Sequence, residues 1–230
     1  LIISASELRD FLRCRTKWYW RWVARLQPLK RSVPLTMGTI GHNILGKWYE
    51  IPKFKQRTVS AMEEIADKVL LETDPEEMTR DDIELLRAMC VGYAAWARPR
   101  DREIKMRNPR QEVFFNEPLT EDGSIRVIGY IDVLFEARYL KGTIGSLESK
   151  FKSQIKMGGT DQNIQLSLYL WAMSRLFPEA KRYIAWYQIL RKQMPGPRVK
   201  ADLFARDSVE RTMDEIRQWV LSLGPEAVVL

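Results

Sequence analysis

The sequence predicts an α/β protein with a central mixed β-sheet flanked by helices and with a helical N-terminal half. Apolar residues recur every three or four positions through most of the first hundred residues, which is the period of an α-helix. Beyond residue 108, three segments rich in β-branched and aromatic residues follow one another, separated by short turns. A helix, two strands and a last helix complete the order β-β-β-α-β-β-α, which suits one sheet covered by helices.

The helical half is expected to contain several separate helices. Ser4 and Glu7 form the S-x-x-E pattern of a capping box, so the first helix begins after Ser4. Further helices are expected from residue 36 up to Pro52, over 59–71 and over 81–96. The last of these should end before Pro99, because proline disfavours helical backbone at the residue that precedes it.

The second half is expected to supply the strands of the sheet. Strands are predicted over 112–119, 125–137, 143–151, 183–190 and 199–204. The helix between the third and fourth strands runs over 161–176, with Asp161 as its N-cap. Asp207 is expected to cap the last helix, because aspartate is among the preferred N-cap residues.

Length, composition and charge restrict what this chain can be. Its 230 residues suit one domain, with 1–100 mainly helical and 108–230 forming the sheet core. No apolar run approaches the roughly 20 residues that span a bilayer and no signal-peptide pattern opens the chain, so no membrane partner is expected. Two cysteines cannot build a disulfide framework, which favours a reducing cytoplasm. The net charge of +7 favours a polyanionic partner.

Two central strands carry a pattern suited to metal chemistry. The period of two places Tyr130, Asp132 and Leu134 on one face of the first strand, and Glu148 and Lys150 on one face of the next. The connection between them is short enough for antiparallel neighbours, so Asp132 could lie beside Glu148. Adjacent carboxylates repel unless a cation neutralises them, and Mg²⁺ prefers such oxygens. For E-S-K alone, an incidental salt bridge on a surface strand pair is favoured about ten to one.

Two further sets of residues are candidates for a site. His42 is the only histidine and follows Gly38 by one helical turn, which leaves space beside the imidazole. A lone histidine is more often an ordinary core or surface residue than a metal ligand. Gln162, Gln165 and Tyr169 form a polar stripe on an otherwise apolar helix and need partners there. Ordinary buried hydrogen bonds explain that stripe equally well.

Taken in order, these motifs resemble the RecB-like branch of the PD-(D/E)XK nuclease superfamily. The motifs are Gly38-x-x-x-His42, Glu112 on a strand, Gly129-Tyr-Ile-Asp132, Glu148-Ser-Lys150 and Gln165-x-x-x-Tyr169. The resemblance covers about residues 4–169 and implies a restriction-endonuclease-like core. It also implies that Asp132, Glu148, the carbonyl of Ser149 and His42 bind Mg²⁺ or Mn²⁺, and that Lys150 is the catalytic lysine. Gln165 and Tyr169 would line the site near the DNA, and Glu112 matches a frequent acidic position.

The N-terminus resembles the iron–sulfur members of the same branch. Ser4-x-Ser6-x-Leu8-x-x-Phe11-x-x-Cys14 matches their opening, in which the cysteine is one of four cluster ligands. Two thiols cannot complete such a site, so a [4Fe-4S] cluster requires that the chain extend beyond Leu230. From the start at Leu1 rather than Met, we expect that this sequence is a portion of a longer chain. For the chain as given, a plain buried thiol at Cys14 is the favoured interpretation.

Cations alternate with aromatic residues directly after this motif. The cations are Arg13, Arg15, Lys17, Arg21 and Arg25, and the aromatic residues are Trp18, Tyr19, Trp20 and Trp22. Such a segment suits single-stranded DNA, in which bases stack and phosphates pair with cations. Amphipathic helices that pack their aromatic residues into the core are about twice as probable, given usual helix patterning.

The function expected from the resemblance is a Mg²⁺- or Mn²⁺-dependent DNA exonuclease. It would act on single- or double-stranded DNA ends in recombination, repair or phage DNA processing, in the cytoplasm of a bacterial or phage-infected cell. A restriction-type endonuclease on the same core is the alternative within enzymes. A catalytically silent DNA-binding module ranks last, because the acidic pair and the lysine are all present. Oligomers and recombination partners are left open.

Overall fold

The computed structural model describes residues 1–26, 32–74, 77–138, 141–196 and 202–227, with side chains described up to residue 222. The helical half begins with a short strand that the sequence did not predict, β1 (Ile2–Ser4). The helices of this half are α1 (Ala5–Arg13), α2 (Arg15–Trp18), the π-helical turn η1 (Tyr19–Val23), α3 (Val33–Glu50), the 3₁₀ turn η2 (Phe54–Gln56), α4 (Val59–Leu71) and α5 (Arg80–Glu103). None of the described helices is both long and apolar enough to cross a membrane.

The second half supplies the sheet. Its elements are β2 (Met106–Pro118), β3 (Arg126–Ala137), β4 (Thr143–Lys152), the 3₁₀ turn η3 (Thr160–Gln162), α6 (Ile164–Leu176), β5 (Arg182–Arg191), β6 (Phe204–Arg211) and α7 (Met213–Ala227). The six-stranded sheet has the order β1-β3-β4-β5-β6, and β2 pairs with β3. The β1–β3 and β4–β5 pairs are parallel, whereas the others are antiparallel, so the predicted mixed sheet is confirmed.

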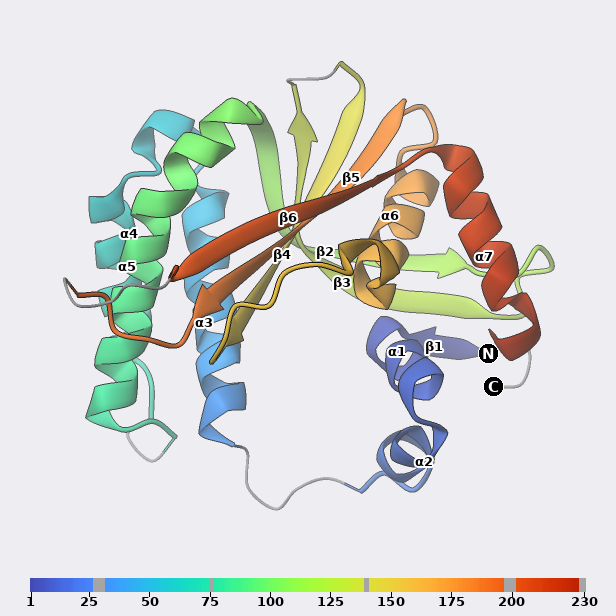
Figure 1. Cartoon of the computed structure of the whole chain (residues 1–230), viewed down its shortest axis with the longest axis horizontal. Coiled ribbons are helices and arrows are strands. Elements are labelled where there is room, and N and C mark those ends of the chain that lie inside the picture. Colours follow the sequence, from blue (N-terminus) through green and yellow to red (C-terminus); the bar gives the residue numbers. More distant parts are fainter. Residues whose placement is uncertain (27–31, 75–76, 139–140, 197–201, 228–230) are drawn as a thin grey trace.

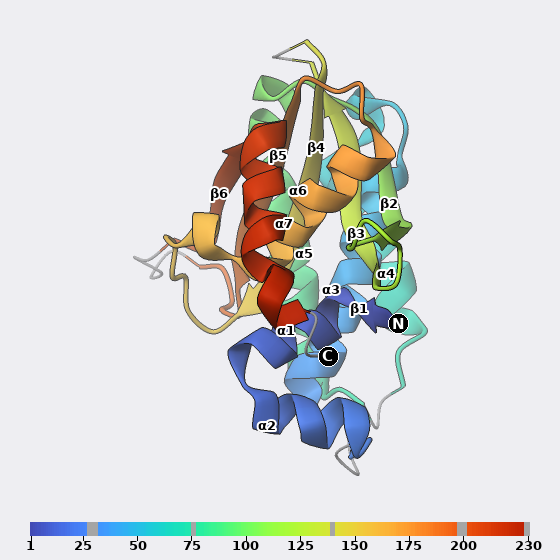
Figure 2. The same ribbon diagram turned by 90° about the vertical axis from the view of Figure 1, so that its right-hand side faces the viewer.

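Two apolar layers bury the faces of the sheet. On one face, α3, α4 and α5 pack against Val133, Phe135, Leu147 and Trp186. On the other face, α1, α6 and α7 pack against Val127, Ile131, Leu134 and Ala185. Figures 1 and 2 show the sheet between these two groups of helices. Burial of these apolar side chains, worth roughly 1.5–3 kcal/mol for each large one, holds both layers to the sheet.

The predicted end of the last N-terminal helix is wrong, because α5 continues through Pro99 to Glu103. A proline inside a helix costs about 3 kcal/mol, since it removes one backbone hydrogen bond and crowds the preceding turn. Tertiary contacts hold the helix on both sides of Pro99, because Ala97 before it and Asp101 after it are both fully buried. Asp101 also accepts hydrogen bonds from Tyr49 and Arg206, which lie on other elements.

Three local predictions in the second half are also corrected. Asn163, not Asp161, caps α6, because its side chain accepts from the N–H groups of Gln165 and Leu166. The last strand was predicted over 199–204 but runs over Phe204–Arg211, so it shares only Phe204 with the predicted range, and residues 199–201 lie outside the described residues. Asp207 lies in that strand, where it accepts from Thr160, and Thr212 caps α7 through a reciprocal capping box with Glu215.

Candidate active site

The candidate site lies where β3 and β4 separate. Along one edge of β3, the parallel pairing with β1 ends at Ile128, and the antiparallel pairing with β4 begins at Val133. Residues 129–132 therefore have no strand partner on that edge in the described part of the chain. β4 continues beyond Leu147 paired only with β5. The fork between β3 and β4 thus opens at Asp132 and Glu148.

A backbone irregularity opens the same point from the other side. Glu112 on β2 has a φ of 45°, in the left-handed region, and lies between the registered pairs Gln111↔Val133 and Val113↔Ile131. Ile131 packs on the α6 side of the sheet, yet Val133 packs on the α3 side. The side-chain alternation is therefore reset at Asp132. The predicted shared face of Tyr130, Asp132 and Leu134 is wrong for this reason: Leu134 is buried on the α6 side with Ile131, whereas Tyr130 is exposed.

Seven of the sequence-predicted residues line one hollow of ≈ 270 Å³ at the fork. They are His42, Glu112, Asp132, Glu148, Ser149, Lys150 and Gln165. His42 Nδ1 lies 3.1 Å from Asp132 Oδ2, and the Ser149 N–H donates to the same oxygen at 3.3 Å. Lys150 forms an ion pair with the buried carboxylate of Glu148. The hollow therefore combines two carboxylates, an imidazole and an ammonium group.

Helices from both layers reach this hollow. α3 brings His42, and its neighbour Gly41 allows the close approach, because a Cβ there would lie 2.3 Å from the Phe151 ring on β4. Gly38, which the sequence singled out, faces open space. From α6, the buried Tyr169 hydroxyl donates to Glu148 Oε2 at 2.8 Å, and the Gln165 amide donates to Tyr169 at 3.0 Å.

Electrostatics differ between the two carboxylates. Burial raises the pKa of Glu148, and the nearby charge of Asp132 raises it further against the opposing effect of Lys150. Burial also acts to raise the pKa of Asp132, but the hydrogen bond and charge of His42, together with Lys150, lower it overall. Burial opposes protonation of His42, yet the hydrogen bond and charge of Asp132 raise its pKa. One carboxyl group thus holds a proton more readily than its neighbour, as acid–base sites often require.

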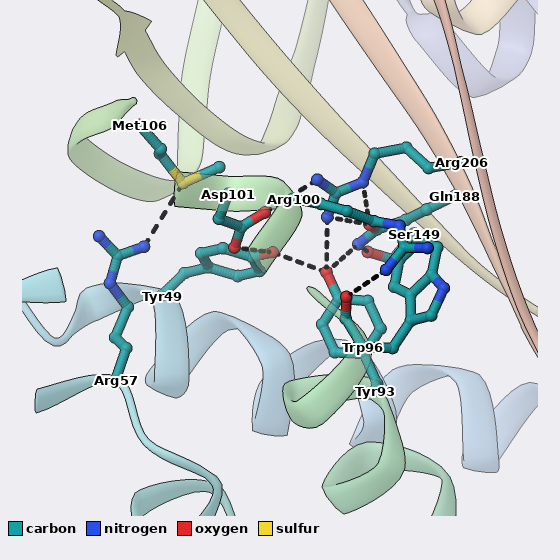
Figure 3. A network of polar contacts seen from close by, with 10 residues as sticks. All are labelled: Tyr49, Arg57, Tyr93, Trp96, Arg100, Asp101, Met106, Ser149, Gln188 and Arg206. Atoms are coloured by element: carbon teal, nitrogen blue, oxygen red, sulfur yellow. Dashed lines mark hydrogen bonds and ion pairs between the residues drawn. The ribbon is translucent and has the colours of Figure 1, made fainter. Parts of the chain in front are cut away.

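A buried polar network supports the strand beneath the hollow, and sequence reasoning missed it. Gln188 on β5 is fully buried and donates to Ser149 Oγ at 2.7 Å and to Tyr93 at 2.6 Å. Its carbonyl oxygen accepts from Arg206, which forms an ion pair with Asp101 at 2.8 Å. Figure 3 shows these groups converging from the helices on one side of the sheet and from its strands. The one sequence feature that could have indicated this network is Gln188, a polar residue in the otherwise apolar strand β5.

A second residue that the sequence did not indicate is Arg9 on α1. Its guanidinium donates to Gln165 Oε1 at 3.2 Å. Arg9 and Gln165 line a neighbouring hollow of ≈ 310 Å³, which Asp132 also borders. The two hollows therefore meet at the fork. Arg9 thus brings a positive charge to the edge of the fork.

The ligand atoms of the site suit a hard divalent ion, although the side chains do not form a preorganised coordination site. No group of three histidine, cysteine, aspartate or glutamate side chains converges as metal ligands among the described residues. The ammonium of Lys150 supplies the neutralising charge beside Glu148 in this structure. The two carboxylates are nevertheless oxygen donors of the kind that Mg²⁺ and Mn²⁺ prefer, and the imidazole adds one nitrogen donor.

The N-terminal candidates lie on the α1–α2 segment. The Cys14 thiol is exposed rather than buried, and Cys90 is buried in the core. An iron–sulfur cluster at Cys14 stays a prediction. The expected packing of the aromatic residues into the core is wrong for Tyr19 and Trp20, which are 49% and 51% exposed. The indoles of Trp18 and Trp22 instead donate to acidic residues of α1.

Comparison with known proteins agrees with this fold. The sequence profile of the PD-(D/E)XK nuclease superfamily matches residues 2–228, so the chain belongs to that superfamily. The expected restriction-endonuclease-like core is thereby confirmed. No curated protein matches the chain. One similar solved structure is that of a candidate exonuclease from Eubacterium rectale, 11% identical, with a TM-score of 0.55 over 99% of this chain and 80% of that one. Another, SSO0001, is 14% identical over 97% of this chain and 82% of that one, with a TM-score of 0.35.

Proposed function

We propose that this protein is a Mg²⁺- or Mn²⁺-dependent deoxyribonuclease that removes nucleotides from DNA ends. The observation that carries the proposal is the meeting of His42, Asp132, Glu148 and Lys150 at the strand fork, within a chain of the PD-(D/E)XK superfamily. The name of the Eubacterium rectale structure supports the exonuclease assignment, because that structure shares the fold. Recombination, repair or phage DNA processing in the cytoplasm is the setting that we propose.

Asp132, Glu148, His42 and the Ser149 carbonyl would hold the ion. The Ser149 N–H points to Asp132, and the carbonyl of a strand residue faces the same side as its N–H. That carbonyl therefore faces the fork. A divalent ion bound there lowers the pKa of a water molecule and stabilises charge on the phosphate.

The remaining residues would orient the carboxylates and the substrate. Tyr169 fixes the Glu148 carboxylate through its 2.8 Å hydrogen bond, and Gln165 in turn orients Tyr169. Lys150 is 30% exposed, so its ammonium group can reach both Glu148 and a phosphate oxygen in the hollow. Positive charge preset beside the phosphate stabilises the negative charge that develops in the transition state.

The test is incubation of end-labelled single- and double-stranded DNA, and of circular DNA, with Mg²⁺, Mn²⁺ or EDTA. We expect metal-dependent loss of nucleotides from linear ends. Asp132→Asn, Glu148→Gln and Lys150→Met should each lower the rate by at least a hundredfold while leaving DNA binding largely intact, because phosphate contacts elsewhere dominate affinity. Glu84→Gln, on an exposed ion pair of α5, is the matched control and should retain full activity.

The other outcomes identify the alternatives. Cleavage of the circular substrate at internal positions would indicate the restriction-type endonuclease. DNA binding without cleavage under every metal condition would indicate a silent DNA-binding module and reject the enzyme. Full activity in the Asp132 or Glu148 variant would reject the proposed metal site.

A further inference from the structure

A second hollow, of ≈ 670 Å³, lies at the junction of the α3–α4 connection, the end of α5 and the start of β2. Six exposed cationic residues line it: Lys53, Lys55, Arg102, Lys105, Arg107 and Arg138. Arg138 forms an ion pair with Glu136 at 3.6 Å, whereas the other five have no ion-pair partner within the described ranges. The sole carboxylate of the lining is Asp101, which is fully buried and paired with Arg206. We name this hollow the basic pocket.

Arg57 lies at the base of the basic pocket and is short of partners. Its side chain is 1% exposed, and within the described part of the chain its Nη1 has one hydrogen-bond acceptor, the Met106 sulfur at 3.5 Å. Its Nε has no hydrogen-bond partner among the residues that the structure describes. The guanidinium lies 5.2 Å from the centre of the Phe54 ring and 5.9 Å from that of Tyr49. Thioether sulfur is a weak acceptor and aromatic faces give modest attraction, so these contacts do not replace a hydrated guanidinium's hydrogen bonds.

The charges around Arg57 do not balance within the protein. Arg206 and Asp101 form a buried pair with no net charge, in which Arg206 also donates to Gln188. Figure 3 shows Arg57 apart from that pair, with Met106 as its single drawn partner. Arg57 therefore adds an uncompensated positive charge beneath a rim of further cations. Burying an unpaired charge destabilises the folded protein, so a bound anion that pairs with Arg57 would stabilise it.

We propose that the basic pocket is a phosphate-binding site, with the Arg57 guanidinium as its base and the surrounding lysines and arginines as its rim. Arginine suits this role because its planar donors match two phosphate oxygens at once. The phosphate would belong to the DNA strand whose cleavage is proposed above, so the identity of the ligand rests on the proposed function. The capacity of the basic pocket to bind a phosphate is independent of the proposed function.

The position of the pocket fits a contact at a distance from cleavage. Tyr49 is seven residues from His42 on α3, roughly 10 Å along the helix. Met106 is six residues from Glu112 on β2, roughly 20 Å along the strand. The phosphates of one strand lie about 3.4 Å apart along the axis of a duplex, so these distances correspond to roughly three to six nucleotides. The pocket would therefore hold a substrate strand in register while its end is processed.

The first experiment measures thermal unfolding in EDTA with increasing inorganic phosphate, at constant ionic strength set with chloride. Phosphate should raise the midpoint of the wild-type protein, because a ligand that binds only the folded state stabilises it. Arg57→Met should abolish this response, and Arg57→Lys should retain part of it. Arg80→Met is the control, since Arg80 is 91% exposed and pairs with Glu84, and it should respond as the wild type does. An identical phosphate response in the wild type and in Arg57→Met would overturn the site, as would no response in the wild type.

The second experiment identifies the source of the phosphate. Binding of oligonucleotides in EDTA is measured with neutral methylphosphonates at successive positions, and with phosphorylated or unphosphorylated ends. Loss of one bound phosphate should weaken wild-type binding roughly tenfold, because a charged hydrogen-bonded contact is lost, and should leave Arg57→Met unchanged. An effect three to six nucleotides from the end assigns a backbone phosphate, and an effect of the end group assigns a terminal one. Equal sensitivity in both proteins overturns the proposal.

These experiments separate the pocket from the proposed function. If the protein cleaves no DNA but its phosphate response depends on Arg57, only the nuclease assignment fails. If cleavage occurs and Arg57 has no effect on phosphate or DNA binding, only the pocket fails.

Discussion

Replacing Tyr49 by phenylalanine tests the buried network with the loss of a single oxygen. The Tyr49 side chain is 1% exposed, and its hydroxyl donates to Asp101 Oδ2 at 3.0 Å. The same hydroxyl lies 2.6 Å from the Tyr93 hydroxyl. Because an ionised carboxylate only accepts, the Tyr49 hydroxyl donates its hydrogen bond to Asp101, and the Tyr93 hydroxyl must therefore donate to Tyr49.

The expected loss follows from these two bonds. A hydrogen bond to a charged group contributes roughly 1.5–3 kcal/mol and a neutral one roughly 1 kcal/mol, so Tyr49→Phe should lower the free energy of unfolding by roughly 2–4 kcal/mol. For a chain of this length, each kcal/mol corresponds to about 2–4 °C in Tm. A fall of roughly 5–15 °C is therefore expected, measured by calorimetry and by urea unfolding.

The matched control for this change is Tyr19→Phe. Tyr19 is 49% exposed, so removal of its hydroxyl should change the free energy of unfolding by less than about 0.5 kcal/mol. A double-mutant cycle with Tyr93→Phe should show coupling, because the two hydroxyls share one bond. If Tyr49→Phe behaves like Tyr19→Phe, the network does not stabilise the fold as argued.

Three further predictions concern single side chains. Iodoacetamide should modify the exposed Cys14 in the native protein and leave Cys90 intact until unfolding, because burial raises the pKa of the Cys90 thiol; mass spectrometry distinguishes them. Thr79→Ala should cost about 1 kcal/mol in urea unfolding, since it removes the capping box of α5, and an unchanged midpoint would contradict this. The rate of cleavage at subsaturating Mn²⁺ should fall as the pH decreases, with a midpoint above about 6.5. The reason is that the pKa of His42 is raised, so that below this midpoint the imidazole is protonated and cannot bind metal. The His42→Asn variant should lack that midpoint.

Much of the fold was predictable because local signals and tertiary packing agree. The strand containing Glu148 and Lys150 was expected over 143–151 and lies at Thr143–Lys152, since alternating residues meet a buried layer on each face. The helix expected over 59–71 has those bounds, Val59–Leu71. The polar strand Phe204–Arg211 was missed because Arg206 and Asp207 bind partners contributed by distant segments. The residues close to this strand in the sequence give no indication of these distant partners.

The residue types of the candidate site were visible in the sequence, whereas its geometry was not. The order of His42, Asp132, Glu148 and Lys150 could be found from motifs, and the structure brings them to one hollow. The left-handed backbone at Glu112, which lies across from the change in alternation at Asp132, gives no sequence signal, because glutamate rarely adopts it. Arg57 was equally hidden, since an isolated arginine in a basic loop predicts exposure rather than burial.

The fork between β3 and β4 has a consequence for how the protein is made. His42 is 106 positions before Glu148, and Tyr169 follows another 21 positions later, so the hollow depends on contacts between residues that are distant along the chain. Such contacts form late, because closing long loops costs entropy before any contact offsets it. β4 also pairs with β5 along its whole length, as far as Arg191. A chain whose synthesis has not yet passed Arg191 therefore lacks a complete neighbour for β4, so the activity that we propose would be delayed until the sheet is whole.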